Sequence, residues 1–403
     1  MSTARRTHGF RESVIRGMTR LAREYDSLNL AQGFPNFPAP ELLKAAAAQA
    51  IHDDINQYAI TWGAGRLRRA LAASYARRYG LEADPEREIT VTCGATEAMI
   101  STLLAVVDPG DEVIVFEPFY ENYGPDTILA DARPVYVPLE PGQPLDLDRL
   151  AAAFTPRTRA IVVNTPSNPA GRVLSRPELE AIARLCREHD VLAVTDEIYE
   201  HIRYRGEHVP IATLPEMRGR TVTISGASKT FGVTGWRVGW IIAPAALTDA
   251  IRKVHDFLTV GAPAPLQEGV AAALEQLDDE FYRDLAQGYQ RRRDTLHSAL
   301  VGAGFRCTPP EGAYYILADY SAVSDLADDT AFAVWLSREV GVTPVPGSSF
   351  FREGGGGRSM VRFVFCKTDD VLAEAARRLA GIGSARPAAR GEHEAAVRSG
   401  LQS

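Results

Sequence analysis

The residues best suited to covalent chemistry lie in one segment, Ser225-Gly-Ala-Ser228-Lys229-Thr-Phe-Gly-Val-Thr-Gly-Trp-Arg237. Lys229 stands among small residues just after a short apolar run, and Arg237 follows eight residues later. A lysine in cramped, partly apolar surroundings has a lowered pKa, so its neutral amine can form a Schiff base with a carbonyl compound. An arginine guanidinium is suited to binding a phosphate dianion. The segment therefore predicts a carbonyl-trapping lysine close to a phosphate site.

Three further segments that follow apolar runs of the chain contain candidate binding residues. Gly94-Ala95-Thr96 follows one run and begins a helix pattern, so its backbone N–H groups could hold an anion, although many strand-to-helix turns look the same. Asp196 directly follows another run, with Tyr199 three residues later, and an acid there is as often only a helix cap. Asn168, in Asn164-Thr-Pro-Ser-Asn168-Pro, has turn chemistry as its default interpretation.

The hydrophobic pattern predicts a scaffold for these residues in which short apolar runs alternate with helices. Such a pattern is typical of parallel strands covered on both faces, whose ligands bind beyond the carboxyl ends of the strands. We therefore predict an α/β fold, with a large, mostly parallel-sheet domain that has helices on both faces, plus a smaller α+β domain. The predicted strands are 89–93, 112–116, 160–164, 191–195 and 221–225, and the predicted helices are 66–78, 97–107, 176–189 and 280–303.

The predicted domain limits follow from these elements and from changes in composition. Residues 1–40 form an N-terminal arm that belongs to the smaller domain, and residues 41–285 form the large domain. Residues 286–383 complete the smaller domain. The last stretch, 384–403, is rich in Ala, Arg, Gly and Glu without an apolar face, and it is predicted to be a disordered tail.

Composition excludes several classes of protein. The net charge of −7 argues against nucleic acid as a partner, because a phosphate-binding surface needs a basic face. No stretch approaches the ~20 apolar residues of a membrane helix, and the N-terminus lacks the apolar core of a secretory signal. The four cysteines lie far apart, without metal-ligand spacing. We expect a cytoplasmic protein with no metal site, no membrane and no nucleic acid.

Together, these residues resemble a known family. A lysine that traps a carbonyl group, an arginine for phosphate and an acid facing a pyridinium nitrogen are what a pyridoxal phosphate enzyme needs. The chain resembles the class I and II aminotransferases of pyridoxal phosphate fold type I, most nearly the branch of kynurenine/glutamine transaminases and methionine aminotransferases. The resemblance extends from Leu30-Ala-Gln-Gly33-Phe-Pro to Arg362-Phe-Val-Phe365, about four fifths of the chain. The lysine segment matches the family's signature throughout.

The resemblance implies roles for the residues around the cofactor ring. Lys229 forms the Schiff base and shuttles the proton between the substrate's Cα and C4′ of the cofactor. Asp196 keeps the pyridine nitrogen protonated, while Tyr199 and Asn168 hydrogen-bond the phenolic oxygen; Asn168 also faces the substrate. Tyr120 is similar to the aromatic residue that stacks on the pyridine ring, with an ordinary core aromatic as the alternative.

The resemblance also implies contacts to the phosphate and to the substrate. Ala95, Thr96 and Arg237 are similar to the phosphate ligands. Tyr58 is similar to a tyrosine that reaches the phosphate of the neighbouring subunit, which implies a homodimer with shared active sites. Arg362 is similar to the small-domain arginine that binds the substrate's α-carboxylate, with a backbone contact from Gly33 beside it.

Two positions depart from the pattern of many relatives. A serine that often lies three residues before the lysine as a phosphate ligand is Gly226 in this chain, with Ser225 and Ser228 on either side. Either serine is therefore a candidate for the phosphate contact. Some relatives carry a tyrosine where this chain has Thr96. Neither change removes a catalytic group.

The activity implied is transamination, in which an L-amino acid gives its amino group to the cofactor and a 2-oxo acid then accepts it. The same scaffold also hosts lyases, cyclases and oxidases that act on amino acids, so these remain the alternative. A non-enzymatic regulatory protein would add a DNA-binding domain, and the roughly 30 residues before Leu30 are too few for one. A pocket lined by Tyr58, Tyr120 and Tyr123 would suit an aromatic, sulfur-containing or amide side chain.

Overall fold

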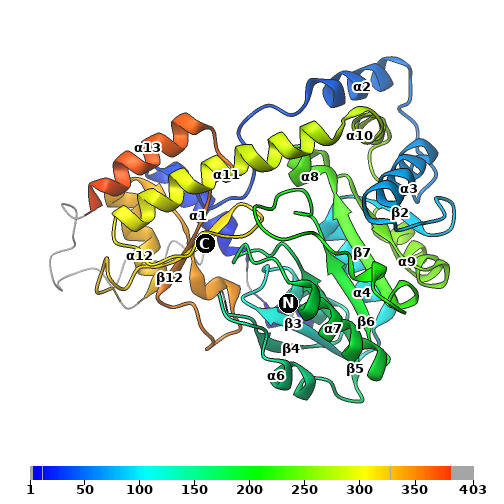
Figure 1. Ribbon diagram of the computed structural model, residues 1–403, viewed down its shortest axis with the longest axis horizontal. Helices are drawn as coiled ribbons and strands as arrows, with labels where there is room; N and C mark the ends of the chain where they lie inside the picture. Colours follow the sequence, from blue (N-terminus) through cyan, green and yellow to red (C-terminus); the bar gives the residue numbers. More distant parts are fainter. Residues whose placement is uncertain (1–2, 11, 141, 327, 383–403) are drawn as a thin grey trace.

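A seven-stranded sheet forms the centre of the larger part of the molecule (Figure 1). The computed structural model describes residues 3–10, 12–140, 142–326 and 328–382. Only β8 runs antiparallel to its neighbours in this sheet, so the prediction of a mostly parallel sheet is confirmed. In spatial order the strands are β2 (Ile89–Thr92), β8 (Gly239–Ile242), β7 (Thr221–Gly226), β6 (Leu192–Asp196), β5 (Thr158–Asn164), β3 (Glu112–Glu117) and β4 (Arg133–Pro138).

Helices cover both faces of this sheet, because alternate side chains of its strands point to opposite sides. On β3, Ile114 is buried in a cluster that includes side chains of α7 (Arg176–Glu188). The next residue, Val115, is buried in a different cluster, with side chains of α4 (Ala95–Val106) and α9 (Ala245–Leu258). Strands with two buried faces have few solvent-facing positions, which explains the continuous apolar runs inside β3, β5 and β6.

Local signals place the ends of several helices. A capping box between Ser175 and Glu178 begins α7, where the backbone N–H of Ser175 donates to Glu178 Oε2 at 2.9 Å. Gly80 ends α3 in the left-handed conformation, with a φ of 65°. The other helices of the larger part are α2 (Glu41–His52), α3 (Gly65–Tyr79), α5 (Tyr123–Leu129), α6 (Leu147–Ala152), α8 (Ala227–Thr230) and α10 (Ala264–Gln276).

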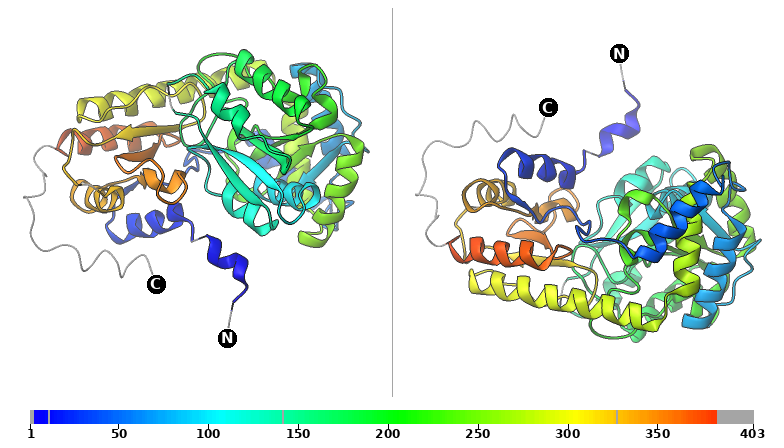
Figure 2. Two further views of the ribbon diagram at one scale, coloured as in Figure 1. Left: turned by 90° about the horizontal axis from the view of Figure 1, so that it is seen from below. Right: turned by 90° about the horizontal axis from the view of Figure 1, so that it is seen from above.

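The smaller part combines the N-terminal segment with the C-terminal third of the described chain (Figure 2). Met18 and Leu30 are buried in the same cluster as Phe363 and Leu372, so segments far apart in sequence share one core. Its helices are α1 (Val14–Glu24), α11 (Asp279–Gly302), α12 (Asp329–Trp335) and α13 (Asp369–Ala380). Its sheets are β11 (Val345–Pro346), β12 (Met360–Val364) and β9 (Tyr315–Asp319), and the pair β1 (Leu28–Asn29) with β10 (Val342–Thr343).

The predicted elements agree with the structure to within a few residues, whereas the domain limits stay predictions. The predicted limit at residue 285 falls inside α11, which continues as one helix from the larger part into the smaller part (Figure 1). The segment 384–403 lies outside the described residues. None of the helices in the described ranges has the length and hydropathy that a membrane span requires.

Candidate active site

A cavity at the carboxyl ends of the central strands brings most of the predicted site residues together. Asn164 and Asp196, which end β5 and β6, both line it, as does Lys229, just beyond β7. Gly33 and Arg362 contact residues of its wall. The predicted residues that line the cavity are Ala95, Thr96, Tyr120, Asn168, Asp196, Tyr199, Ser228, Lys229 and Arg237.

Lys229 lies in α8, the single helical turn that follows β7. Its Nζ donates to the backbone oxygen of Gly33 at 3.3 Å. Burial lowers the pKa of the amine from 10.5 to about 8, and the nearby charge of Arg237 acts in the same direction. A substantial fraction of the amine is therefore neutral near physiological pH, which is the form that attacks a carbonyl carbon.

Asp196 is a buried carboxyl group held by several hydrogen bonds. Its Oδ2 accepts a hydrogen bond from the Tyr123 hydroxyl at 2.7 Å, and Oδ1 accepts one from the backbone N–H of Ile198 at 3.3 Å. Burial raises the pKa of the carboxyl, while the Tyr123 hydroxyl and the charge of Lys229 oppose that rise. A buried acid of this kind is stabilised by a cation placed against it, such as a protonated ring nitrogen.

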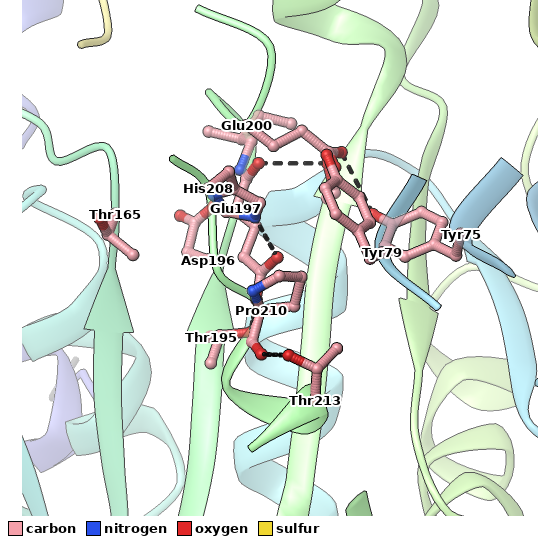
Figure 3. A network of polar contacts seen from close by, with 12 residues as sticks. Tyr75, Tyr79, Thr165, Thr195, Asp196, Glu197, Glu200, His208, Pro210 and Thr213 are labelled. Carbon is pink, nitrogen blue, oxygen red and sulfur yellow. Dashed lines mark hydrogen bonds and ion pairs between the residues drawn. The ribbon is translucent and has the colours of Figure 1, made fainter. Parts of the chain in front are cut away.

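A network of polar contacts holds the turn that carries Asp196 from behind (Figure 3). Glu197 accepts a hydrogen bond from the Thr195 hydroxyl at 2.8 Å, and its Oε2 lies 2.6 Å from Nε2 of His208. Glu200 accepts hydrogen bonds from the hydroxyls of Tyr75 at 3.2 Å and Tyr79 at 2.7 Å. The turn is therefore fixed on both sides, because these two glutamates face the network while the residues between them face the cavity.

An anion cradle lies between the start of α4 and Arg237. Gly94 precedes the helix with a φ of 83°, and a Cβ at this position would lie 2.3 Å from Nη2 of Arg237. Arg237 itself has a φ of 53°, an uncommon conformation for a residue with a side chain. Its Nη1 donates to the backbone oxygen of Thr234 at 3.0 Å. The guanidinium is thus held over the N-terminus of a twelve-residue helix, whose dipole also favours an anion.

Aromatic and amide groups form the remaining walls. The hydroxyls of Tyr199 and Tyr315 lie 2.6 Å apart. Tyr120 is packed edge-on against Tyr123, with ring centroids 5.8 Å apart. The backbone N–H of Asn168 donates to Oδ1 of Asn164 at 2.8 Å, which holds the Asn168 loop against the carboxyl end of β5.

Arg362 is a buried cation without a carboxylate partner among the described residues. Its side chain is among the largest that are fully buried. Nη1 donates to Oδ1 of Asn168 at 2.8 Å and Nη2 donates to the backbone oxygen of Ala31 at 2.6 Å, while Nε is buried without a hydrogen-bond partner. The guanidinium carbon lies 4.5 Å from the centroid of the Tyr315 ring. Because an unpaired buried charge is costly, this arrangement favours an anionic ligand group next to Asn168.

Two of the predicted cofactor ligands do not line the cavity. The Ser225 hydroxyl donates to Oε1 of Glu200 at 2.8 Å, so it belongs to the network behind the turn, whereas Ser228 lines the cavity. Tyr58 is 87% exposed and lies in a separate surface hollow with Ile60. The pocket that Tyr58, Tyr120 and Tyr123 were expected to form is therefore not made within one chain.

Sequence reasoning missed Asp126 and Tyr315 in the cavity wall, and it missed the contact that Tyr123 makes. Tyr123 was expected only to line a pocket, whereas its hydroxyl contacts Asp196. Asp126 lies one helical turn later on α5, and burial raises the pKa of its carboxyl to about 7. Tyr315 comes from the smaller part of the molecule, and nothing in its local sequence places it opposite Tyr199. The only sequence signal for these contacts was the spacing of Tyr123 and Asp126, which places both residues on one face of a helix.

Comparison with known proteins identifies the family. The model of the class I and II aminotransferases matches residues 25–379. The chain belongs to this family. It is 40% identical over 398 residues to an N-succinyldiaminopimelate aminotransferase of Mycobacterium tuberculosis, covering 96% of this chain and all of that one. It is 38% identical over 379 residues to human kynurenine–oxoglutarate transaminase 1, covering 86% of this chain and 90% of the relative.

Solved structures of aminotransferases have the same fold. The M. tuberculosis N-succinyldiaminopimelate aminotransferase superposes with a TM-score of 0.92 over 94% of this chain and all of that chain. An Escherichia coli protein with a methionine aminotransferase function superposes with a TM-score of 0.90, is 36% identical, and is matched over 94% of this chain and 99% of its own. The aminotransferase is accordingly a fold type I enzyme, and enzymes of this family use pyridoxal phosphate.

The residues of the cavity fit this cofactor. The cradle of Gly94 and Arg237, which a Cβ on the glycine would fill, suits the phosphate. Asp196 suits the ring nitrogen, because its buried carboxyl is best stabilised by a cation. Tyr199 and Asn168 offer hydrogen-bond donors for the phenolic oxygen. The aminotransferase moves amino groups between amino acids and 2-oxo acids, and this donor set provides what such a reaction requires.

Proposed function

We propose that Lys229 is the catalytic lysine of this aminotransferase, and that the enzyme transfers the amino group of an L-amino acid to a 2-oxo acid. The observation that carries the proposal is that one cavity contains a lysine with a pKa of about 8, a buried acid and an anion cradle. The bound pyridoxal phosphate supplies an electron sink for the bond that is broken at the substrate's Cα. With the cofactor bound, the neutral amine of Lys229 would take the proton from the substrate's Cα and would return it at C4′.

The other residues bind and orient the reactants. Asp196 keeps a proton on the ring nitrogen, because its buried carboxylate is stabilised by the positive charge. Arg237 and the start of α4 hold the phosphate. Arg362 binds the α-carboxylate of the substrate, since its guanidinium is buried without an anionic partner among the described residues. Gly33 leaves room there, because a Cβ at this position would lie 2.6 Å from the Tyr315 hydroxyl.

The amino acid donor that we propose has an aromatic or sulfur-containing side chain. Tyr120 and Tyr315 offer ring surface in the cavity, and Met99 adds an apolar side chain. An acidic donor would need a second cation, and among the described residues the only arginine of the cavity wall is Arg237. Relatives named for kynurenine and methionine support this class of donor.

We further propose that the enzyme is a cytoplasmic homodimer in which Tyr58 contributes to the active site of the partner subunit. Ile60, in the same surface hollow, is 47% exposed, and the large apolar side chains of Phe257 and Val260 are also exposed, at 93% and 46%. Exposed apolar side chains that gather in one contiguous patch are typical of protein interfaces. All four cysteines are free thiols, which agrees with a reducing compartment.

The test is a half-reaction of the purified holoenzyme with single L-amino acids in the absence of any 2-oxo acid. The visible absorbance of the bound cofactor should be lost, and one equivalent of a 2-oxo acid per active site should appear. The donors that give this result define the substrate class. Release of ammonia, a thiol or peroxide with recovery of the original absorbance would instead assign a lyase or an oxidase. An unchanged spectrum with every aromatic or sulfur-containing donor would contradict the proposed donor class.

A further inference from the structure

A second cavity, away from the cofactor site, is lined by an unusual number of arginines. It has a volume of about 540 Å³ and lies between the end of α3, the segment after the Asp196 turn and the start of α11. Its wall contains four arginine side chains and a single carboxylate, that of Asp279. The arginines are Arg77, Arg78, Arg203 and Arg283. This local excess of positive charge occurs in a chain whose net charge is −7.

Three separate elements direct these side chains to one place. Arg77 and Arg78 lie in the last turn of α3, where positive charge also complements the helix dipole. The helix dipole does not explain the positive charge of Arg203, which lies in an extended segment, or that of Arg283, which lies near the N-terminus of α11. On α11 the residues of the wall are Asp279, Tyr282, Arg283, Ala286 and Gln287, a spacing that places them on one helical face.

Several polar atoms of the cavity lack partners. Nη1 of Arg78 lies 3.1 Å from Asp279, but its Nε and Nη2 are buried without a hydrogen bond. Nε of Arg203 is buried and unpaired as well. The guanidinium carbon of Arg78 lies 3.8 Å from the centroid of the Tyr282 ring. Buried donors are normally satisfied, so unpaired ones on two residues that line the same cavity favour an acceptor bound there.

Three of the four arginines of the cavity have no ion-pair partner within the described chain. There, no carboxylate forms an ion pair with Arg77, Arg203 or Arg283, and Asp279, the partner of Arg78, is itself 72% exposed. Burial lowers the pKa of His201, with Arg78 acting in the same direction, so the imidazole is neutral and adds a hydrogen-bonding group. Arg77 and Arg283 are exposed, so water screens part of the repulsion among the four guanidinium groups, and an anion bound between them would relieve the rest.

We propose that this cavity binds a small organic or inorganic anion with several negative charges, carried by phosphoryl or carboxylate groups. Planar guanidinium groups match both kinds of oxyanion through paired hydrogen bonds. The cavity is distinct from the phosphate cradle at Arg237, because none of its residues lines the cofactor cavity. It adjoins the buried network, since Tyr79 lines it and donates to Glu200.

The experiment is isothermal titration of the holoenzyme, freed of unbound cofactor, with inorganic pyrophosphate and, separately, with citrate. We expect saturable binding of one anion per chain, weakened by added salt. Arg203→Gln and Arg283→Gln should each raise the Kd by about 10-fold, because each removes a charged hydrogen-bond donor. Tighter binding of pyrophosphate would assign a phosphoryl ligand, and tighter binding of citrate would assign a polycarboxylate.

The matched control is Arg291→Gln, which makes the same charge change at an exposed position farther along α11 and outside the cavity. Its Kd should stay within about twofold of the original value, because a surface charge outside the site contributes little. The variants should keep the visible spectrum and the Tm of the holoenzyme, which separates lost binding from lost folding. Absence of saturable binding by both anions, or equal weakening in Arg291→Gln, would overturn the proposal.

Discussion

At the scale of single residues, the surroundings of Lys229 turn an ordinary side chain into a reactive one. Burial lowers the pKa of its amine to about 8, and the backbone oxygen of Gly33 holds Nζ at 3.3 Å. Asp196 lies in the same cavity. Burial raises the pKa of its carboxyl, whereas burial lowers the pKa of the Lys229 amine. Acidic and basic groups whose pKa values are shifted by their surroundings are typical of catalytic sites.

Replacement of Lys229 by alanine should abolish turnover while leaving the phosphate cradle intact. We expect kcat to fall by about 10²–10⁴-fold or more, because the group that transfers the proton is lost. Pyridoxal phosphate should still bind, held by Arg237 and the start of α4, with a changed absorbance spectrum. Steady-state kinetics and a cofactor titration measure both effects. The control is Lys253→Ala, since that lysine is exposed and paired only with Asp249; turnover by Lys229→Ala close to that of this control would refute the assignment.

The lowered pKa of Lys229 predicts how the apoprotein captures its cofactor as the pH changes. Only the neutral amine reacts, so the rate should rise about tenfold per pH unit below about 8 and level off above it. An amine with the ordinary pKa of 10.5 would instead give a rate that still rises at pH 10. Stopped-flow absorbance after mixing with pyridoxal phosphate provides the measurement. A rate that continues to rise up to pH 10 would show that burial does not lower this pKa.

At the scale of elements, the site depends on the turn after β6, which is held by groups that never touch the cavity. Glu197 and His208 are both 1% exposed at their side chains and lie 2.6 Å apart. Burial opposes protonation of His208, but the charge of Glu197 and their hydrogen bond raise its pKa overall. The stability from this pair is therefore fully present below the unfolded pKa near 6.5, and it is lost as the pH rises through the folded value.

Replacement of His208 by leucine should loosen this turn. The buried carboxylate of Glu197 loses its partner, so we expect a destabilisation of about 3–5 kcal/mol and a weaker hold on the cofactor. The loss of Tm relative to the original enzyme should be largest below pH 6.5 and should shrink at higher pH. Thermal melting across pH and the dissociation constant of pyridoxal phosphate measure the two effects.

A matched control for this network lies at the other end of the sheet. Glu112 begins β3 and is a buried carboxylate held by Arg157, whose Nη2 lies 2.7 Å from Oε1. Glu112→Gln should therefore lower the Tm without changing the cofactor's dissociation constant, because β3 ends at the cavity and begins far from it. If Glu112→Gln and His208→Leu weaken cofactor binding equally, the network behind Asp196 has no positioning role.

At the scale of the whole molecule, the site is assembled from both parts of the chain and, in our proposal, from two chains. Lys229 and Asp196 come from the larger part, and Arg362 comes from β12 in the smaller part. Tyr58 is 87% exposed and Phe257 is 93% exposed, so both aromatic side chains face solvent in the single chain. A second copy of the chain would bury both.

Mixing two inactive variants tests whether Tyr58 acts across a dimer. We expect Tyr58→Ala and Lys229→Ala to be impaired alone, whereas their hybrid dimers should each contain one site with Lys229 from one chain and Tyr58 from the other. Random exchange should then restore about a quarter of the original activity. Activity after subunit exchange and the mass from sedimentation equilibrium provide the readouts. No recovery in a confirmed hybrid would show that Tyr58 acts in its own chain, and a monomer would exclude the shared site.

Local patterns allowed much of this architecture and part of the site to be predicted. The apolar runs inside β3, β5 and β6 are uninterrupted because each of these strands is buried on both faces. The capping box at Ser175 marked the start of α7 directly. By contrast, β4 was not predicted, because its residues are only partly buried and alternate weakly. The contact of Tyr123 with Asp196 joins residues 73 positions apart, beyond the reach of any local pattern.

The sequence by itself determined the parallel sheet, the helices that cover it and the identity of the lysine segment, because burial periodicity and capping act over a few neighbouring residues. Only the tertiary structure decided which groups meet. It turned Ser225 toward Glu200 while Ser228 faces the cavity, and it left Arg362 buried beside Asn168 without an anionic partner in the described chain. It also gathered four arginines from three elements around one hollow. The reason is that such contacts depend on how distant elements pack, and this is set by the shared core rather than by local sequence.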